Sequence, residues 1–210
     1  MKLLPRYCPD TMAYGQANSP RYNQWVSVMG ESFKHMHHYC WAQLSVMRAM
    51  KSSSSGQARK GLLENARADY EYVVGNSAPS FILLPEVYTR LGDVELMLRN
   101  PNGANGAFAK ARALRPDYWP AYSHWAEFLI RAGKRDEARQ LLKTGLEYSP
   151  GAKVLLEQYR QVGGKASEIV PRESKPEPEE TPSEPANKAA DEKAHSEGDK
   201  AAEPGVKAER

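Results

Sequence analysis

A 34-residue period between Pro85 and Pro150 is the feature of this sequence that most constrains its fold. Two units align position by position, and a proline closes each of them, at Pro116 and at Pro150. At six matching positions of each unit the side chains are, in order, large, large, small, small, large and small. The matching positions are Tyr88, Leu91, Gly92, Ala104, Phe108 and Ala111 in the first unit and Tyr122, Trp125, Ala126, Ala138, Leu142 and Gly145 in the second. This order predicts two antiparallel helices per unit that cross where the side chains are small.

Further helices extend the array on both sides. Upstream, Ala66, Tyr70 and Val73 have the spacing of a second helix, and residues 32–50 are expected to form its first helix, with a polar insertion at residues 51–61 between them. After Pro150, "AKVLLEQYRQV" predicts a capping helix. We therefore expect an all-α domain at residues 31–164. It comprises a degenerate repeat (31–80), two regular repeats (85–118 and 119–152) and a cap helix (153–164), because such stacks need roughly three units.

Two glycines of the second unit have opposite expected effects. Turns are expected between the helices of each unit, at residues 99–105 and 131–137, and Gly133 is well placed to end a helix. Gly145 lies inside a predicted helix, where glycine costs about 1 kcal/mol relative to alanine.

The two ends of the chain have a different composition. Residues 1–30 predict an irregular N-terminal arm. Residues 165–210 contain almost no large apolar side chains, and residues 171–210 carry 7 Lys and Arg against 11 Asp and Glu. Such a segment cannot bury enough surface to offset its conformational entropy, so a disordered tail is predicted there.

The stretch "HMHHYCW" at residues 35–41 allows more than one interpretation. On a helix, His37, Cys40, Trp41, Leu44 and Met47 share one face, which has the period of an ordinary core stripe. Alternatively, the histidines face a partner protein, or they bind a metal ion such as zinc or copper. The candidate metal ligands are His35, His37 and His38. A closed metal site needs at least three converging ligands, so a bound metal ion is the less favoured interpretation, and no cofactor is expected.

The chain has two cysteines, Cys8 and Cys40. Cys8 lies in a proline-bounded segment that needs something to hold it, whereas Cys40 lies on a predicted helix. A disulfide between them would close a loop of about 33 residues and contribute roughly 3–4 kcal/mol in the chain-entropy model. Two buried free thiols are the alternative.

The repeat positions resemble the tetratricopeptide repeat, although Glu95 stands where that pattern usually has an aromatic residue and Gly145 where it has alanine. The resemblance implies a short right-handed superhelix of antiparallel helix pairs. The segments "LPRYC", "HMHHYCW", "LLPEVYTRLG" and "RPDYWPAYSHWAEFLIRAGKRDEARQLL" further resemble a group of small exported bacterial tetratricopeptide-repeat proteins over most of residues 3–160. In that group the first segment follows a signal peptide, which implies a periplasmic or otherwise exported protein. The sequence as written shows no leader, which leaves the cytoplasm as the alternative.

Several classes of function find no support in the sequence. There is no phosphate-binding glycine loop and no H-E-x-x-H, and no oxyanion turn accompanies Cys40 and His37, so a non-enzymatic protein is predicted. The basic residues of positions 1–60 are scattered rather than arranged in a stripe, which argues against nucleic-acid binding. No segment reaches the roughly 18 apolar residues of a membrane span.

Binding to a protein partner remains the best-supported function. The first helices of stacked pairs line the inner surface of such an array. Its mixture of carboxylates and aliphatic side chains favours a partner segment with basic and apolar residues over an acidic C-terminus. A purely structural spacer is the alternative. The positions expected to contact the partner are Glu86, Thr89, Asp93, Met97, Ser123, Glu127, Ile130 and Arg131.

Overall fold

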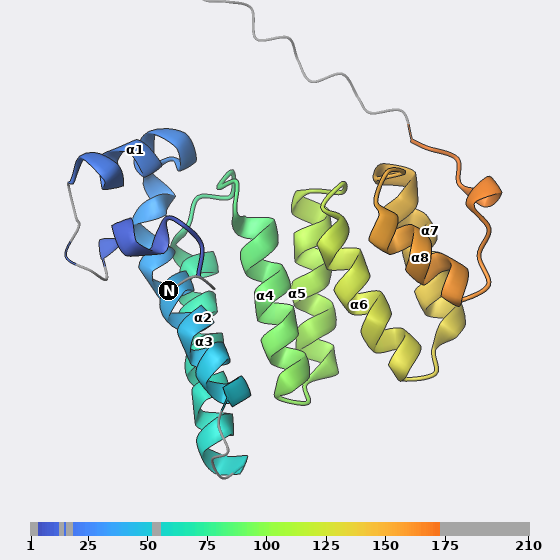
Figure 1. Cartoon of the computed structure of the whole chain (residues 1–210), viewed down its shortest axis with the longest axis horizontal. Helices are drawn as coiled ribbons and strands as arrows, with labels where there is room; N and C mark the ends of the chain where they lie inside the picture. The colour runs from blue at the N-terminus through green and yellow to red at the C-terminus, as the bar shows by residue number, and fades with distance from the viewer. Residues whose placement is uncertain (1–3, 13–14, 16–18, 52–55, 173–210) are drawn as a thin grey trace, which may run out of the picture. The chain divides into compact units, whose positions relative to one another are not determined.

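The computed structural model describes residues 4–12, 15, 19–51 and 56–172, and over these ranges it is built from helices without any strand (Figure 1). The all-α prediction is confirmed. The α-helices are α1 (Pro20–Met29), α2 (Met36–Lys51), α3 (Gly56–Asn76), α4 (Leu84–Met97), α5 (Pro101–Leu114), α6 (Trp119–Arg131), α7 (Arg135–Tyr148) and α8 (Lys153–Gln161). Short 3-10 helices are η1 (Cys8–Asp10), η3 (Glu31–His35) and η4 (Ala166–Glu168).

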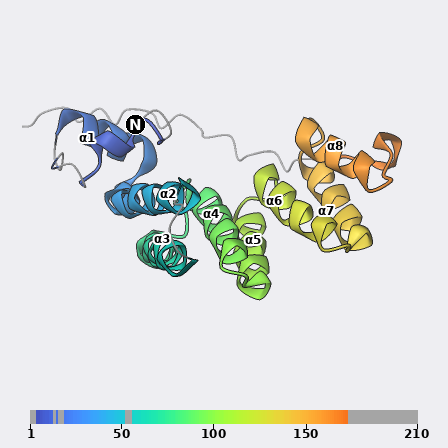
Figure 2. The same cartoon turned by 60° about the horizontal axis from the view of Figure 1, so that its bottom comes forward.

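The helices from α2 onward pack as consecutive pairs. Helices α2 and α3 lie side by side, as do α4 and α5, and α6 and α7 (Figures 1 and 2). Successive pairs meet through α3 with α4, and through α6 with both α4 and α5, while α8 packs on α6 and α7. Each pair therefore buries apolar surface both between its own two helices and against its neighbours.

The turns inside the two regular pairs share one backbone feature. Gly133, between α6 and α7, has a φ of 77°, and Arg99, at the matching position between α4 and α5, has a φ of 62°. Glycine adopts this left-handed conformation freely, whereas an arginine is strained there. Both turns are shorter than expected, because Pro101 and Arg135 already begin the next helices. The Asn100 side chain caps α5 by accepting a hydrogen bond from the Gly103 amide at 3.2 Å.

Two glycines allow helices to approach closely. A Cβ on Gly92 would lie 2.7 Å from Cζ of Phe108, and a Cβ on Gly145 would lie 2.8 Å from Cγ of Tyr122 and 2.9 Å from Cδ1 of Leu155. The expectation that alanine would be better at Gly145 is therefore wrong. Helix propensity favours alanine there, but the space for its methyl group is already filled.

The N-terminal segment is more regular than expected, because residues 1–30 contain η1 and the ten-residue helix α1. The Ser19 hydroxyl caps α1 by accepting from the Tyr22 amide at 3.1 Å, and Pro20 occupies the first turn, where its missing N–H is no loss. The buried Asp10 carboxylate then anchors the helix, since it accepts from Nε1 of Trp25 at 2.9 Å.

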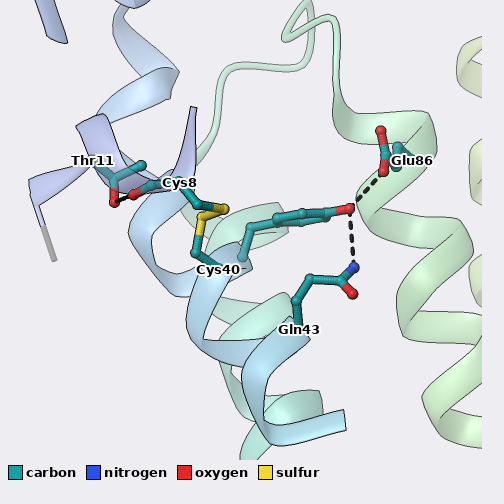
Figure 3. Close-up of a disulfide and its surroundings, with 6 residues drawn as sticks. Cys8, Thr11, Cys40, Gln43 and Glu86 are labelled. Atoms are coloured by element: carbon teal, nitrogen blue, oxygen red, sulfur yellow. Dashed lines mark hydrogen bonds between the residues drawn. A yellow bond between two sulfur atoms is a disulfide. The ribbon is translucent and has the colours of Figure 1, made fainter. Parts of the chain in front are cut away.

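A disulfide joins this segment to α2 (Figure 3). Cys8 and Cys40, the pair expected from the sequence, are both fully buried with their Cα atoms 5.8 Å apart. Beside the bond, the Tyr7 ring lies 6.0 Å from that of Phe33 and 6.3 Å from that of Tyr39, measured between centroids. The N-terminal segment thus completes the core around the start of α2.

The buried face of α2 is not the predicted stripe. Trp41 is 41% exposed, while Leu44, Met47 and His37 are only partly buried. Of the predicted stripe only Cys40 is fully buried, and the other side chains of α2 in the core are Met36, Tyr39, Ala42 and Ala49. Packing against α3 turns this face inward, and that contact is not visible in the hydrophobic period of α2 alone.

The predicted insertion and tail are partly ordered. Helix α3 already begins at Gly56, within the expected insertion, and residues 52–55 lie outside the described residues. Residues 165–172, predicted to be disordered, fold back on α7 and α8. Glu168 accepts from Arg139 at 3.1 Å and from the Tyr159 hydroxyl at 2.6 Å, and these hydrogen bonds lower the pKa of Glu168 to about 2. Nε of Arg172 donates a hydrogen bond to Oε2 of Glu147 at 3.1 Å. The remainder of the predicted tail, residues 173–210, lies outside the described residues.

Removing the disulfide should destabilise the fold strongly. We expect the free energy of unfolding of C8A/C40A to fall by about 3–4 kcal/mol, because the bond closes a loop of roughly 33 residues in the unfolded chain. Urea unfolding followed by tryptophan fluorescence measures this change, and the wild type in excess reductant should approach the variant. A variant as stable as the oxidised wild type would contradict this role of the bond.

Exchanging glycine for alanine should have opposite effects at two sites. We expect Gly92→Ala to cost roughly 1–3 kcal/mol through overpacking against Phe108. Gly106→Ala, in α5 with open space around the new methyl group, should gain up to about 1 kcal/mol. The double variant G92A/F108L restores the combination found 34 residues later, Ala126 with Leu142, and should recover most of the loss. Equal unfolding midpoints for Gly92→Ala and wild type would contradict the close approach.

Candidate functional site

A chain of polar side chains runs across α2, α4 and α6, the first helices of their pairs. Nε2 of Gln43 donates to the Tyr39 hydroxyl at 3.1 Å, and this hydroxyl donates to Oε1 of Glu86 at 2.5 Å (Figure 3). Farther along α4, Oδ1 of Asp93 lies 2.8 Å from Nδ1 of His124 on α6. We call Gln43, Tyr39, Glu86, Arg90, Asp93 and His124 the first-helix polar chain.

Arg90 lies between Glu86 and Asp93 on α4 without a hydrogen bond to either carboxylate. Its Nε lies 3.9 Å from Oε1 of Glu86 and its Nη1 lies 3.8 Å from Oδ2 of Asp93, and both distances exceed those of a hydrogen bond. Nε is buried and has no hydrogen-bond partner among the described residues. Arg90 therefore retains donor capacity at a surface that already carries two carboxylates.

A small pocket of about 80 Å³ adjoins Arg90, between α2, α3 and α4. Its lining includes Gln43, Tyr70, Asp93 and Met97. Burial raises the pKa of Tyr70 and of Tyr39, and the nearby Glu86 carboxylate raises the pKa of Tyr39 further. Both phenols therefore remain neutral at ordinary pH, and Tyr39 serves as a hydrogen-bond donor to Glu86.

Sequence reasoning did not select Arg90 as a site residue. The signal that could have found it is its position on α4, four residues after Glu86 and three before Asp93, which places it between them on one face of a helix. That its Nε has no hydrogen-bond partner among the described residues depends on side-chain geometry and is visible only in the structure.

The predicted partner-contacting residues divide into two groups. Thr89 and Ser123 are buried, with 2% and 5% exposure, and the Thr89 hydroxyl donates to the Pro85 carbonyl at 2.8 Å. Their side chains point between helices and are not offered to a partner, so these two residues are removed from the predicted contact surface. The other six side chains retain exposed or partly buried surface, namely Glu86, Asp93, Met97, Glu127, Ile130 and Arg131.

The three histidines of residues 35–38 have other partners in the structure. Nδ1 of His37 lies 2.8 Å from the Lys34 carbonyl oxygen, and Nδ1 of His38 lies 2.6 Å from Oδ1 of Asp69. The His35 ring contacts that of Tyr72 edge-on, at 5.7 Å between centroids. Burial lowers the pKa of His35 and of His37. Within the described ranges, no three His, Cys, Asp or Glu side chains form a group that could hold a metal ion.

Cys40 is bonded to Cys8, so it offers no thiol that could act as a nucleophile beside His37. None of the helices in the described part of the chain combines the length and apolar character required to cross a membrane.

Comparison with known proteins supports the repeat assignment. The family model of the tetratricopeptide repeat matches residues 95–158, which extend from the end of α4 into α8. This range overlaps most of the segment with the 34-residue period, Pro85 to Pro150. No curated protein matches the sequence. The match supports the resemblance drawn from the repeat positions, and it suggests a module for interaction between proteins.

The purified chain should not retain a metal ion. After incubation with excess zinc and dialysis, we expect native mass spectrometry to show the mass of the metal-free chain. The reason is that Nδ1 of His37 and Nδ1 of His38 are already hydrogen-bonded, and within the described ranges no third His, Cys, Asp or Glu side chain converges with them to hold a metal ion. One zinc ion per chain that is lost in a folded His38→Ala variant would contradict this expectation.

Proposed function

We propose that this protein is a non-enzymatic scaffold that binds a segment of a partner protein across the exposed sides of α4 and α6. The observation that carries this proposal is the first-helix polar chain, in which Arg90 lies between Glu86 and Asp93 without a close hydrogen bond to either. Because these ion pairs are long, Glu86 and Asp93 can replace the contact with Arg90 by a contact with a cation of the partner segment. The match to a repeat family that serves protein interaction supports the same conclusion.

The chemistry of the surface favours a basic and apolar partner segment. Glu86, Asp93 and Glu127 supply carboxylates, and Met97 and Ile130 supply apolar surface. Glu127 is the most accessible of these carboxylates, with a side chain 60% exposed, and within the described ranges it pairs with Arg131 at 3.7 Å. Exposed pairs of this kind contribute at most about 1 kcal/mol, so a cation of the partner can replace Arg131 at little cost.

We further propose that the protein acts outside the cytoplasm, in the periplasm or after export. The disulfide between Cys8 and Cys40 supports this location, because such bonds persist in oxidising compartments and are reduced in most cytoplasms. The resemblance of "LPRYC" and "HMHHYCW" to exported bacterial proteins points in the same direction.

Charge reversal at Glu127 should weaken partner binding selectively. Glu137 on α7 is a matched control, because its side chain is 59% exposed and it also has a single basic neighbour, Lys134 at 2.9 Å. We expect Glu127→Lys to weaken binding of a partner about 5- to 30-fold, as reversal of one interfacial charge typically does, and Glu137→Lys to leave binding unchanged.

The measurement has two stages. Quantitative mass spectrometry first identifies proteins that the immobilised wild type and the Glu137→Lys variant both capture and that Glu127→Lys loses. Titration calorimetry then compares the three chains against each purified candidate. Equal affinity of all three chains for every captured protein would show that the face of α4 and α6 is not the binding surface.

A further inference from the structure

A second cavity lies on a different part of the array, where the start of α3 meets the end of α4. It has a volume of about 460 Å³. Leu63, Leu96 and Leu98 provide apolar lining, and Arg59, Lys60 and Arg99 provide positive charge. Of the residues predicted to contact a partner on the first-helix face, only Met97 also lines this cavity.

The cations of this cavity are largely uncompensated. Lys60 lies 3.6 Å from Glu64, in a pair whose side chains are 61% and 44% exposed. Arg59 and Arg99 form no ion pair with any residue in the described ranges. Two guanidinium groups beside an apolar lining give the cavity a positive charge that the described residues around it do not neutralise.

The backbone at Arg99 supplies an independent observation. Arg99 has a φ of 62°, whereas the matching turn of the next pair has Gly133 with a φ of 77°. A glycine would take this conformation without strain, so the turn itself does not require arginine. Strain of this kind at a residue that lines a cavity points to a role for the side chain rather than for the backbone.

We propose that this cavity binds a segment of a protein partner that carries one large apolar side chain next to carboxylates. The apolar side chain would occupy the leucine-lined part of the cavity, and the carboxylates would accept paired hydrogen bonds from Arg59 and Arg99. A cavity of this size is large enough for one such side chain with its neighbouring groups. Nucleic acid fits less well, because its backbone requires an extended basic stripe rather than three cations around apolar surface.

This inference goes beyond the proposed function and does not depend on it. The first-helix face presents carboxylates and selects a basic segment, whereas the α3–α4 cavity presents guanidinium groups and selects an acidic one. The chain therefore holds two binding surfaces of opposite charge preference, and the same protein can engage two different segments at once.

Selection from a displayed library of random heptapeptides tests the proposal with the full-length oxidised chain. We expect peptides enriched on the wild type to combine Asp or Glu with one Leu, Ile, Phe or Trp, and to lose this enrichment on R59Q/R99G. A library without enrichment over the double variant, or enriched peptides without acidic residues, would overturn the proposal.

A synthetic copy of the most enriched peptide then locates the site. In titrations followed by NMR, amide shifts should concentrate at residues 56–63 and 96–99, and Arg99→Gly should weaken binding about tenfold. Arg99→Gly removes the strained residue, so its melting temperature should equal or exceed that of the wild type, which separates lost binding from lost folding. Arg160→Gln on α8, where the arginine side chain is 64% exposed, is the matched control and should bind as the wild type does. Unchanged affinity of Arg99→Gly, or shifts confined to α6, would overturn the proposal.

Discussion

The close approach of neighbouring helices at small residues is the constraint on which the rest of this structure depends. Gly92 lies directly against the Phe108 ring, and Gly145 against Tyr122 and Leu155. The two regular pairs solve the same packing problem with different volumes: glycine opposite phenylalanine in the first, and alanine opposite leucine at the matching positions of the second. Because protein interiors are packed to near-crystalline density, a methyl group at one of these crossings must be balanced by a loss of volume opposite.

Both proposed binding surfaces depend on how successive helix pairs pack against one another. Tyr39, Glu86 and Asp93 can form a polar chain only because α2, α4 and α6 lie in a fixed order along the array. The α3–α4 cavity likewise arises where one pair ends against the next. Neither surface exists on an isolated helix pair, so binding and folding draw on the same contacts between successive pairs.

The parts of the structure that the sequence could predict are those that repeat. The 34-residue period predicted the helix pairs α4–α5 and α6–α7, because each crossing position occurs twice and the two copies support each other, although α5 and α7 begin earlier than expected. The start of α1 also has a local sequence signal, because Ser19 followed by Pro20 is typical of a helix N-terminus. In contrast, nothing local to residues 165–172 shows that Glu168 meets Arg139 on α7, so composition alone predicted disorder there.

The site was harder to predict than the fold, because burial within a helix face depends on its neighbours. Thr89 and Ser123 occupy first-helix positions that can face solvent, yet both are closed off by adjacent helices. The buried face of α2 differs from the predicted stripe for the same reason, because packing against α3 buries Tyr39 and Ala42 and leaves Trp41 exposed. Arg90 and the strained Arg99 were missed because unused hydrogen-bonding capacity and backbone strain are geometric properties.

The fold-back of residues 165–172 has a consequence for self-association. It bridges α7 and α8, the two helices against which the second helix of an additional pair would pack, and Ile169 covers apolar surface at that position. A helical array with an exposed apolar end can pack against the first helices of another copy. Head-to-tail association of this kind does not close on itself and can continue without limit. Residues 165–172 therefore leave less of that apolar end free for another copy to pack on.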